Sequence, residues 1–463
     1  NQPHQTTKNA MSKKRKNKAH PTPAINTQLH PNAAGIDVGA EEFVVAVPAD
    51  RCPESVRTFP SFTSGVEALC EWLLACRITT ASMESTGNYW ITLYDRLTAA
   101  GIDVYLVNAR HVKGVPGKKT DVCDAQWLQQ LHSAGLLKKS FRPTLEIVPL
   151  RFLMRHRSEM LGDSARQLQL MQKTLTEMNI KIQHVFSDID GTSAQAIITA
   201  ILQGERDPAK LADLRDGRCR SSVSAIMEAL KGDYREEYLF VLGQSQSAWH
   251  QLSQAIGECD KKIAVLMGEV HTQEGPPLPP ASGQQHRMTK NCPNLPIFEE
   301  SWRFFGVDLS AVPGVGGGLL STLMTELGTR EQILKQFGST SALSSWLGLN
   351  PDNRISGGKV LKAKTRKVVS RLAKALRMGV FGLQKSNTKL GEYVRKMKAR
   401  LGKAEGIVAG AHKLVRIIYG MIKNQKPYDE TEAFKTTPQT AARRRRNLEK
   451  QAAALGLQLV AAV

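Results

Sequence analysis

The stretch AAGIDVGAEEFVVAVPAD, residues 33–50, decides the fold of the first part of this chain. Its apolar run reaches Asp37, turns at Gly39 and resumes at Phe43. Two short β-prone runs separated by a glycine-containing turn are typical of a β-hairpin. We therefore expect ordered structure to begin here, after a polar and basic arm over residues 1–32 that we expect to be disordered.

Strand and helix patterns alternate after this hairpin. The order is a helix, a strand that ends at Glu84, a helix closed by Gly101, a further strand and a helix that starts at Asp121. The corresponding residues are 65–76, 78–90, 88–101, 102–109 and 121 onward. Alternation of this kind predicts an α/β domain over residues 33–145.

The pattern changes near residue 146. Leu, Met and Ile recur at steps of three and four over 146–271, which predicts antiparallel or coiled helices. Residues 272–300 are rich in Pro, Gly and Gln and predict a linker. We expect a compact helical domain over 301–426 and a basic tail over 427–463, so that an α/β part is followed by an all-α part.

Basic charge is concentrated in two places in a chain whose formal net charge is +21. Residues 1–30 contain six Lys and Arg and no acid. Residues 351–426 contain 20 Lys and Arg against three acids, a net charge of +17. Such clustering favours a nucleic-acid surface. A basic protein without a particular partner is the alternative.

The cysteines and the apolar runs indicate the compartment. Seven cysteines are scattered without a CxxC pair, which fits a reducing cytoplasm rather than a disulfide framework or a zinc ribbon. No apolar run approaches the roughly 18 residues of a membrane span, and no signal peptide is visible. We therefore expect a cytoplasmic, nucleoid-associated protein with no membrane partner.

Four carboxylates stand where an α/β fold brings residues together. Asp37 and Glu84 end two strands, and Asp121 and Asp124 share one helix face because residues three apart are neighbours there. Open α/β sheets place functional groups at the carboxyl ends of their strands. Mg²⁺ takes oxygen ligands, and two such ions activate a nucleophile and stabilise a leaving oxygen of a phosphodiester. The four acids therefore predict a Mg²⁺ site, with Mn²⁺ as a substitute.

Each acid alone has a simpler interpretation. An Asp after a strand is usually a turn residue, as Asp37 would be. Glu84 could cap the helix that begins near Ser85, and Asp121 could be an N-cap whose charge suits the helix dipole. The order Asp, Glu, Asp-x-x-Asp on matching elements is more specific than any of its members.

A second candidate centre lies in SSWLGLNPDNRISGGKVLKAKTRK, residues 344–367, in which Ser356 is followed by two glycines and a lysine. Glycines let a phosphate approach backbone N–H groups, and cations neutralise charge at phosphorus. The residues alone favour a phosphate clamp, in which Ser356 only donates a hydrogen bond, over a nucleophilic serine. The residues expected to contact nucleic acid are Arg354, Gly357, Gly358, Lys359, Lys362, Lys364, Arg366 and Lys367.

The segment VPGVGGGLLSTLMTELG, residues 312–328, is similar to the hairpin of a helix-hairpin-helix motif. In that motif backbone N–H groups hold a DNA phosphate. The glycines equally fit a tight packing turn between helices, so we assign no catalytic role to this segment.

The order of these parts resembles the DEDD transposases of bacterial insertion sequences, the one-hundred-and-ten family and in particular its eleven-eleven branch. The resemblance covers nearly all of residues 33–460. Three segments carry it most clearly: GKKTDVCDAQWLQQLHSAGLLKKSFRP (117–143), NRISGGKVL (353–361) and AHKLVRIIYGMIK (411–423).

This resemblance implies both a fold and a function. The fold would be a RuvC-like branch of the ribonuclease H fold, a helical middle and a helical C-terminal transposase domain. The function would be an RNA-guided DNA transposase that binds a structured guide RNA from its own element, together with donor and target duplexes, as a dimer or tetramer. Carried over by motif position, Asp37, Glu84, Asp121 and Asp124 would bind Mg²⁺, and Ser356 would attack DNA to form a phosphoserine link.

Two other functions stay open. A hydrolytic RuvC-like nuclease or junction resolvase would use the same acids with activated water and leave Ser356 as a clamp. A non-catalytic nucleic-acid scaffold would carry degenerate acids. A covalent protein–DNA adduct excludes the first, and loss of binding without loss of chemistry on mutating the acids favours the second.

Overall fold

A computed structural model gives the structure of the chain, which divides into two compact units at Arg142. The residues that it describes are 28–85, 87–108, 121–272, 288–357, 359–366, 368–435 and 438–458. Most of the expected arm and of the expected linker lies outside these ranges. None of the helices within them combines the length and the apolar composition that a membrane crossing requires.

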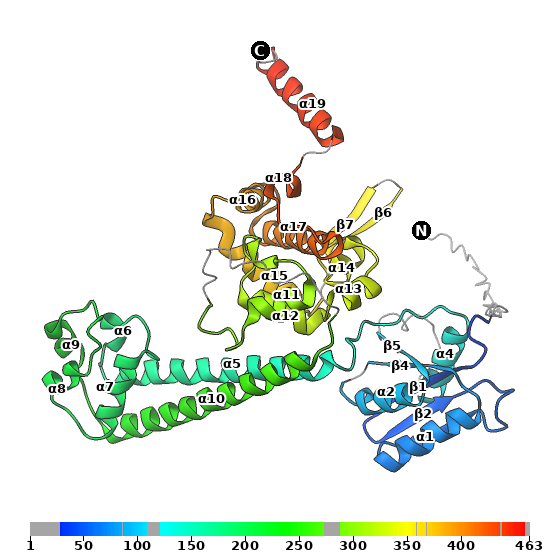
Figure 1. The fold of residues 1–463 in the computed structure, drawn as a ribbon, viewed down its shortest axis with the longest axis horizontal. Coiled ribbons are helices and arrows are strands. Elements are labelled where there is room, and N and C mark those ends of the chain that lie inside the picture. Colours follow the sequence, from blue (N-terminus) through cyan, green and yellow to red (C-terminus); the bar gives the residue numbers. More distant parts are fainter. Residues whose placement is uncertain are drawn as a thin grey trace, which may run out of the picture. The chain divides into compact units, whose positions relative to one another are not determined.

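The first unit contains a five-stranded sheet with the order β3-β2-β1-β4-β5 (Figure 1). The strands are β1 Ala33–Val38, β2 Glu42–Ala46, β3 Val56–Pro60, β4 Thr80–Glu84 and β5 Asp103–Val107. β1, β4 and β5 are parallel, while β2 runs antiparallel to β1 and β3. The sheet confirms the predicted α/β fold and adds β3, for which the sequence predicted no strand.

Helices cover both faces of this sheet. α1 Thr63–Ala75 and α2 Trp90–Ala99 pack with Ile36 and Met83 in one fully apolar core. α4 Asp121–Ser133 covers the opposite face. It lies so close to β1 that a Cβ on Gly35 would stand 2.2 Å from the Ala125 carbonyl oxygen, so only glycine fits there.

The second unit begins with a helical arm, residues 147–269, which is distinct from the basic arm at the N-terminus. α5 Ile147–Glu177 pairs with α10 Glu236–Glu269, and the buried ion pair between Arg157 and Asp260 joins them. Arg157 also donates to the carbonyl oxygens of Asn291 and Cys292. Its buried guanidinium therefore has hydrogen-bond acceptors besides Asp260. Between the two helices lie α6 Ile182–Val185, α7 Thr192–Leu202, α8 Pro208–Asp213 and α9 Val223–Ala229, which share an apolar core.

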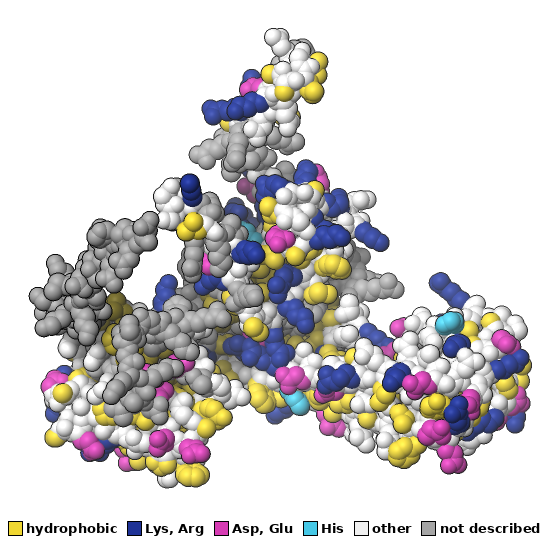
Figure 2. Space-filling model, turned by 180° about the vertical axis from the view of Figure 1, so that it is seen from behind, with side chains coloured by type: hydrophobic (Ala, Val, Ile, Leu, Met, Phe, Trp, Pro, Cys, Tyr) yellow, Lys and Arg dark blue, Asp and Glu magenta, His cyan; other side chains and the backbone are white. Residues whose placement is uncertain are grey.

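A compact group of helices follows the arm. The elements are α11 Ile297–Phe305, η1 Leu309–Ala311, α12 Gly317–Leu327, α13 Arg330–Gln336, α14 Thr340–Trp346, α15 Arg371–Gly382, η2 Leu383–Lys385, α16 Lys389–Leu401, α17 Lys403–Asn424, α18 Glu430–Ala433 and α19 Pro438–Ala454. α11 begins inside the stretch expected to be a linker. Figure 2 shows Lys and Arg side chains gathered over these C-terminal helices, with few Asp and Glu among them.

One element interrupts the helices. β6 Pro351–Ser356 and β7 Lys359–Thr365 form a two-stranded antiparallel hairpin between α14 and α15. The sequence predicted only helices for this domain. Its Gly-Gly pair is a known hairpin-turn signal, but the only apolar residues that flank it are Ile355, Val360, Leu361 and Ala363, too few to predict a buried strand face.

Candidate active site

Asp37 and Glu84 lie at the carboxyl ends of two neighbouring parallel strands. β1 pairs with β4 so that Ile36 stands opposite Met83, and the two acids are the next positions in that register. Ile36 and Met83 are fully buried under α1 and α2. Because side chains alternate along a strand, the two acids belong to the other face, the one that α4 covers. Both side chains are partly exposed.

Contacts between α4 and β4 follow a regular register. Thr80 Oγ1 lies 2.8 Å from His132 Nε2, and Ser82 Oγ donates to the Leu128 carbonyl oxygen at 3.3 Å. Two residues advance a strand by about 6.6 Å and four residues advance a helix by about 6 Å. Each step of two along β4 therefore corresponds to a step of four back along α4.

The same register brings the acids of the strands and the helix to one edge. One further step along β4 puts Asp124 at the level of Glu84. On β1, Gly35 lies against Ala125 and Gln129, so one further step puts Asp37 at the level of the first turn of α4. That turn begins at Asp121, whose backbone belongs to the helix and whose side chain lies outside the described residues.

The groups at this edge fit a hard divalent cation. Asp37, Glu84 and Asp124 offer only carboxylate oxygens, and all three are partly exposed. Carboxylates at one edge repel one another, and a bound cation offsets that repulsion. Within the described ranges, no three His, Cys, Asp or Glu side chains already gather closely enough to hold a metal.

His132, at the opposite end of α4, anchors the helix and was not singled out from the sequence. Thr80 Oγ1 donates to the Asp103 carbonyl oxygen at 2.7 Å, so His132 Nε2 must be the donor in the contact between them. Burial, reinforced by the stacked ring of His30, lowers the pKa of His132 to about 4. The imidazole is therefore neutral near pH 7. Its partner Thr80 lies 52 residues away in the sequence, so no local pattern marked this contact.

Ser356 is the last residue of β6 and is exposed at the turn of the hairpin. Gly357 follows with φ +54°, the left-handed region that such turns require. The register pairs Ser356 with Lys359 across the turn. A hydroxyl and a basic residue thus lie opposite each other at the exposed end of the hairpin.

The other residues expected to contact nucleic acid have different surroundings. Lys359 and Lys364 are exposed, and Lys364 stands opposite Asp352. The backbones of Arg354 and Lys362 are register partners. The side chains of Arg354 and Lys362, and the whole of Gly358 and Lys367, lie outside the described residues.

Arg366 holds the base of the hairpin, a role that the sequence did not predict. Its guanidinium donates to the Ser345 carbonyl oxygen and, at 3.0 Å, to Ser345 Oγ. Beside it, a Cβ on Gly348 would stand 2.6 Å from Val368 Cγ2, so the chain leaving β7 packs closely against the turn after α14. The chain that leaves β7 is therefore held against the end of α14 and the turn that follows it.

The glycine-rich segment before α12 has the geometry of a packing turn. Gly314 has φ +86°, and a Cβ there would stand 2.9 Å from the Gly379 carbonyl oxygen of α15. This close backbone approach explains the glycine without a nucleic-acid role, which agrees with the second interpretation of the sequence.

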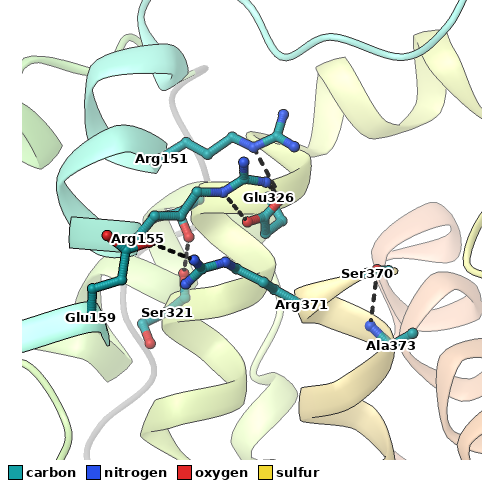
Figure 3. A network of polar contacts seen from close by, with 9 residues as sticks. Arg151, Arg155, Glu159, Ser321, Glu326, Ser370, Arg371 and Ala373 are labelled. Atoms are coloured by element: carbon teal, nitrogen blue, oxygen red, sulfur yellow. Dashed lines mark hydrogen bonds and ion pairs between the residues drawn. The ribbon is translucent and has the colours of Figure 1, made fainter. Parts of the chain in front are cut away.

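Ion pairs join α5 to α12 and α15, the helices that precede and follow the hairpin region in the sequence (Figure 3). Glu326 of α12 is buried and accepts from Arg155 Nε at 3.0 Å and Nη2 at 2.9 Å, and Arg151 Nε lies 3.0 Å away. Arg371 of α15 donates to Glu159 at 3.1 Å. Three arginine contacts thus connect α5 to α12 and α15.

Two family models match the chain. One, for DEDD transposases of the IS110 type, matches residues 34–180, which contain the carboxylate edge. The other, described as the transposase IS116/IS110/IS902 family, matches residues 308–395, which contain the hairpin. A search among curated proteins found no match.

Proposed function

We infer the function from one premise: this chain belongs to the DEDD transposases of the IS116/IS110/IS902 family. Its activity is therefore that of a DNA transposase or recombinase. We propose, beyond that, an RNA-guided enzyme that cuts and rejoins donor and target DNA through a phosphoserine intermediate. The observation that carries this proposal is the exposed Ser356 at the turn of a basic hairpin.

The covalent step would proceed at Ser356. Its Oγ attacks the scissile phosphorus, an Oγ–P bond forms, and the bond from phosphorus to one sugar oxygen breaks. The hydroxyl proton passes to solvent, and the departing oxygen takes up a proton. Attack by another DNA hydroxyl on the phosphoserine reverses these steps and rejoins the strand without ATP.

The remaining groups would assist this exchange. Lys359, opposite Ser356, would neutralise non-bridging phosphate oxygens. Asp37, Glu84, Asp121 and Asp124 would hold Mg²⁺, or Mn²⁺ in its place. When bound, the ion would polarise the scissile phosphate as a Lewis acid.

RNA guidance would divide recognition between two molecules. Base pairing with the guide would read the sequence, while the protein holds backbones by charge and shape, as in other guided effectors. The basic residues of 351–426, with a net charge of +17, supply the necessary surface.

We propose that the arm mediates self-association rather than nucleic-acid binding. Residues 146–271 contain 15 Lys and Arg against 17 Asp and Glu, a net charge of −2. Phe152, Phe240 and Val265 are each more than half exposed on α5 and α10. Light scattering of the guide-bound complex tests this. Phe240→Glu should lower the mass, Phe62→Glu in the first unit should not, and a single wild-type protomer holding both DNAs would contradict it.

The phosphoserine is tested by denaturing electrophoresis with labelled target DNA and the guide. Wild type should form an adduct with Mg²⁺ that disappears with a chelator and in Ser356→Ala. Thr365→Val, which removes a hydroxyl at the far end of the hairpin, should keep it. An adduct in Ser356→Ala would identify another nucleophile, and clean cutting without any adduct would establish a hydrolytic nuclease.

A further inference from the structure

A pocket of about 600 Å³ lies between α17 and the chain that follows it. One wall is a single face of α17, on which Lys413, Arg416, Gly420 and Asn424 succeed one another at steps of three and four. The other wall is the segment from Lys426 to Ala433, which includes α18. The volume is that of a small-molecule site. One wall of this pocket lies largely in the segment 411–423 that the sequence analysis singled out and to which the proposed chemistry assigns no role.

The pocket has an apolar floor. Ile417 and Met421 line it and are more than nine-tenths buried, with Pro427 across from them. Between the two lies Gly420, where a Cβ would meet nothing within 4 Å. The missing side chain leaves room for a flat group against the apolar surface, which suits the face of a nucleobase.

The rim is cationic. Arg416 and Lys426 are exposed, and Lys413 is held in place by its bond to the Ala433 carbonyl oxygen and by the Phe434 ring at 4.6 Å. Two carboxylates also line the pocket, and Asp429 is occupied in capping α18. Cations over an apolar floor match a ligand that combines a planar base with a phosphate.

A tyrosine adds a hydrogen-bond donor to the wall. The Tyr428 hydroxyl is closed off from solvent and has no hydrogen-bond partner within the described part of the chain. Burial, with the nearby Glu430 and Asp429, raises the pKa of Tyr428 to about 12, so the hydroxyl keeps its proton near pH 7. A buried donor without a partner favours a ligand that offers an acceptor.

We propose that the α17–α18 pocket binds one unstacked nucleotide of a single strand, with its base over Gly420 and its phosphate at Arg416 and Lys426. The inference rests on the proposed function insofar as that function brings single-stranded RNA or displaced DNA to this protein. It differs from that function in assigning a base-binding role to a surface remote in sequence from Ser356 and from the acids.

The test fills the pocket without disturbing the helix. Gly420→Leu adds a side chain where there is space, and leucine favours a helix more than glycine does. Gly257→Leu is the matched control, because Gly257 is also a helical glycine with nothing within 4 Å of its Cβ, in α10. Fluorescence anisotropy of the full chain with labelled single-stranded RNA, single-stranded DNA and duplex DNA is the measurement.

Gly420→Leu should weaken single-strand binding about tenfold, the effect of losing one stacked base, and leave duplex binding unchanged. Arg416→Gln should lower the slope of log affinity against log salt for single strands by about 0.7. Loss of RNA binding alone identifies the guide as the source of the nucleotide, and loss of DNA binding alone identifies a displaced strand. Single-strand affinity equal in Gly420→Leu, Gly257→Leu and wild type would overturn the proposal.

The proposed chemistry is followed separately. The Ser356 adduct on duplex target is measured in the same variants. If wild type forms no adduct but Gly420→Leu still loses single-strand binding, the pocket stands and the phosphoserine mechanism fails. If the adduct forms and single-strand binding is unaffected by Gly420→Leu, the phosphoserine mechanism stands and the pocket proposal fails.

Discussion

The carboxylate edge and the serine hairpin are built in opposite ways. Asp37 and Glu84 stand near the ends of β1 and β4, next to the fully buried Ile36 and Met83, and the contact of His132 with Thr80 anchors α4 on the other face of the sheet. Ser356 ends an exposed two-stranded hairpin, an element that has little stability by itself and depends on its base. The comparison shows two different supports: the acids stand on strands of a packed sheet, whereas Ser356 stands on an exposed hairpin, where the proposed attack on DNA would take place.

The largest effect is expected at the carboxylate edge. Glu84→Gln and Asp124→Asn should each lower recombination on the order of 10³-fold, because each removes a carboxylate that would hold the proposed metal ion. The free energy of unfolding should stay the same or rise, since neutralising one acid relieves repulsion among the others. Recombination assays and urea melts check both statements.

The control for this prediction is another acid of the same sheet. Asp103, at the amino end of β5, pairs at the surface with Lys139 at 2.5 Å. An exposed pair contributes little, so Asp103→Asn should keep full activity. Full activity in Glu84→Gln and Asp124→Asn as well would remove the acids from the mechanism.

The next prediction concerns how the pH dependence of stability reports the anchoring of α4 by His132. The pKa of His132 is about 4 in the folded chain and 6.5 ordinarily. Below pH 6.5 the unfolded state binds a proton that the folded state refuses, so the free energy of unfolding should fall between pH 6.5 and 4, by on the order of 3 kcal/mol. Above pH 6.5 this contribution is fully present and constant.

Urea melts at several pH values measure this dependence. His132→Gln keeps a donor for Thr80 but cannot titrate, so it should lack this part of the pH dependence. His250→Gln, on the exposed surface of α10, should behave as wild type. Parallel loss of stability in wild type and His132→Gln would show that α4 is not anchored through this imidazole.

A smaller effect is expected at the base of the hairpin. Arg366→Ala removes both bonds to Ser345 and should slow adduct formation at saturating DNA about tenfold, while DNA affinity changes little. Arg366→Lys should recover part of the rate because an ammonium reaches one of the two acceptors. Equal losses of rate and affinity would instead make Arg366 a DNA contact.

Sequence analysis predicted the acids and most of the sheet for a physical reason. Asp37 and Glu84 each close a run with the residue types of a strand, so their positions at one edge of the sheet could be predicted, while their role in holding a metal stays a prediction. β3 was missed because VRTFP is short, half polar and ends in proline, which gives no periodic signal. The contact of Thr80 with His132 joins residues far apart in sequence and leaves no local pattern.

The hairpin was missed for a different reason. Its flanks, DNRI and KVLKAKT, contain five charged residues and few large apolar ones, so neither strand reads as buried. Sequence reasoning did single out Ser356 and the cations near it, because residue types indicate phosphate binding without reference to the fold, and their role stays a prediction. Elements that bury little surface are therefore easier to assign by chemistry than by shape.

The smallest expected effect tests whether duplex DNA binds to the hairpin or to the helical arm. Lys364 is exposed on β7, and if it contacts one duplex phosphate, Lys364→Gln should lower the slope of log affinity against log salt by about 0.9. Lys210→Gln is the matched control, since Lys210 lies on α8 in the near-neutral arm beside Glu205. Anisotropy titrations of duplex DNA between roughly 50 and 200 mM salt resolve a difference of this size.

An unchanged slope in Lys364→Gln would mean that the hairpin reaches the scissile phosphate without binding the flanking DNA backbone. The helices after the hairpin would then bind that backbone. A reduced slope in Lys210→Gln would make the arm a DNA-binding element, against its balance of charges.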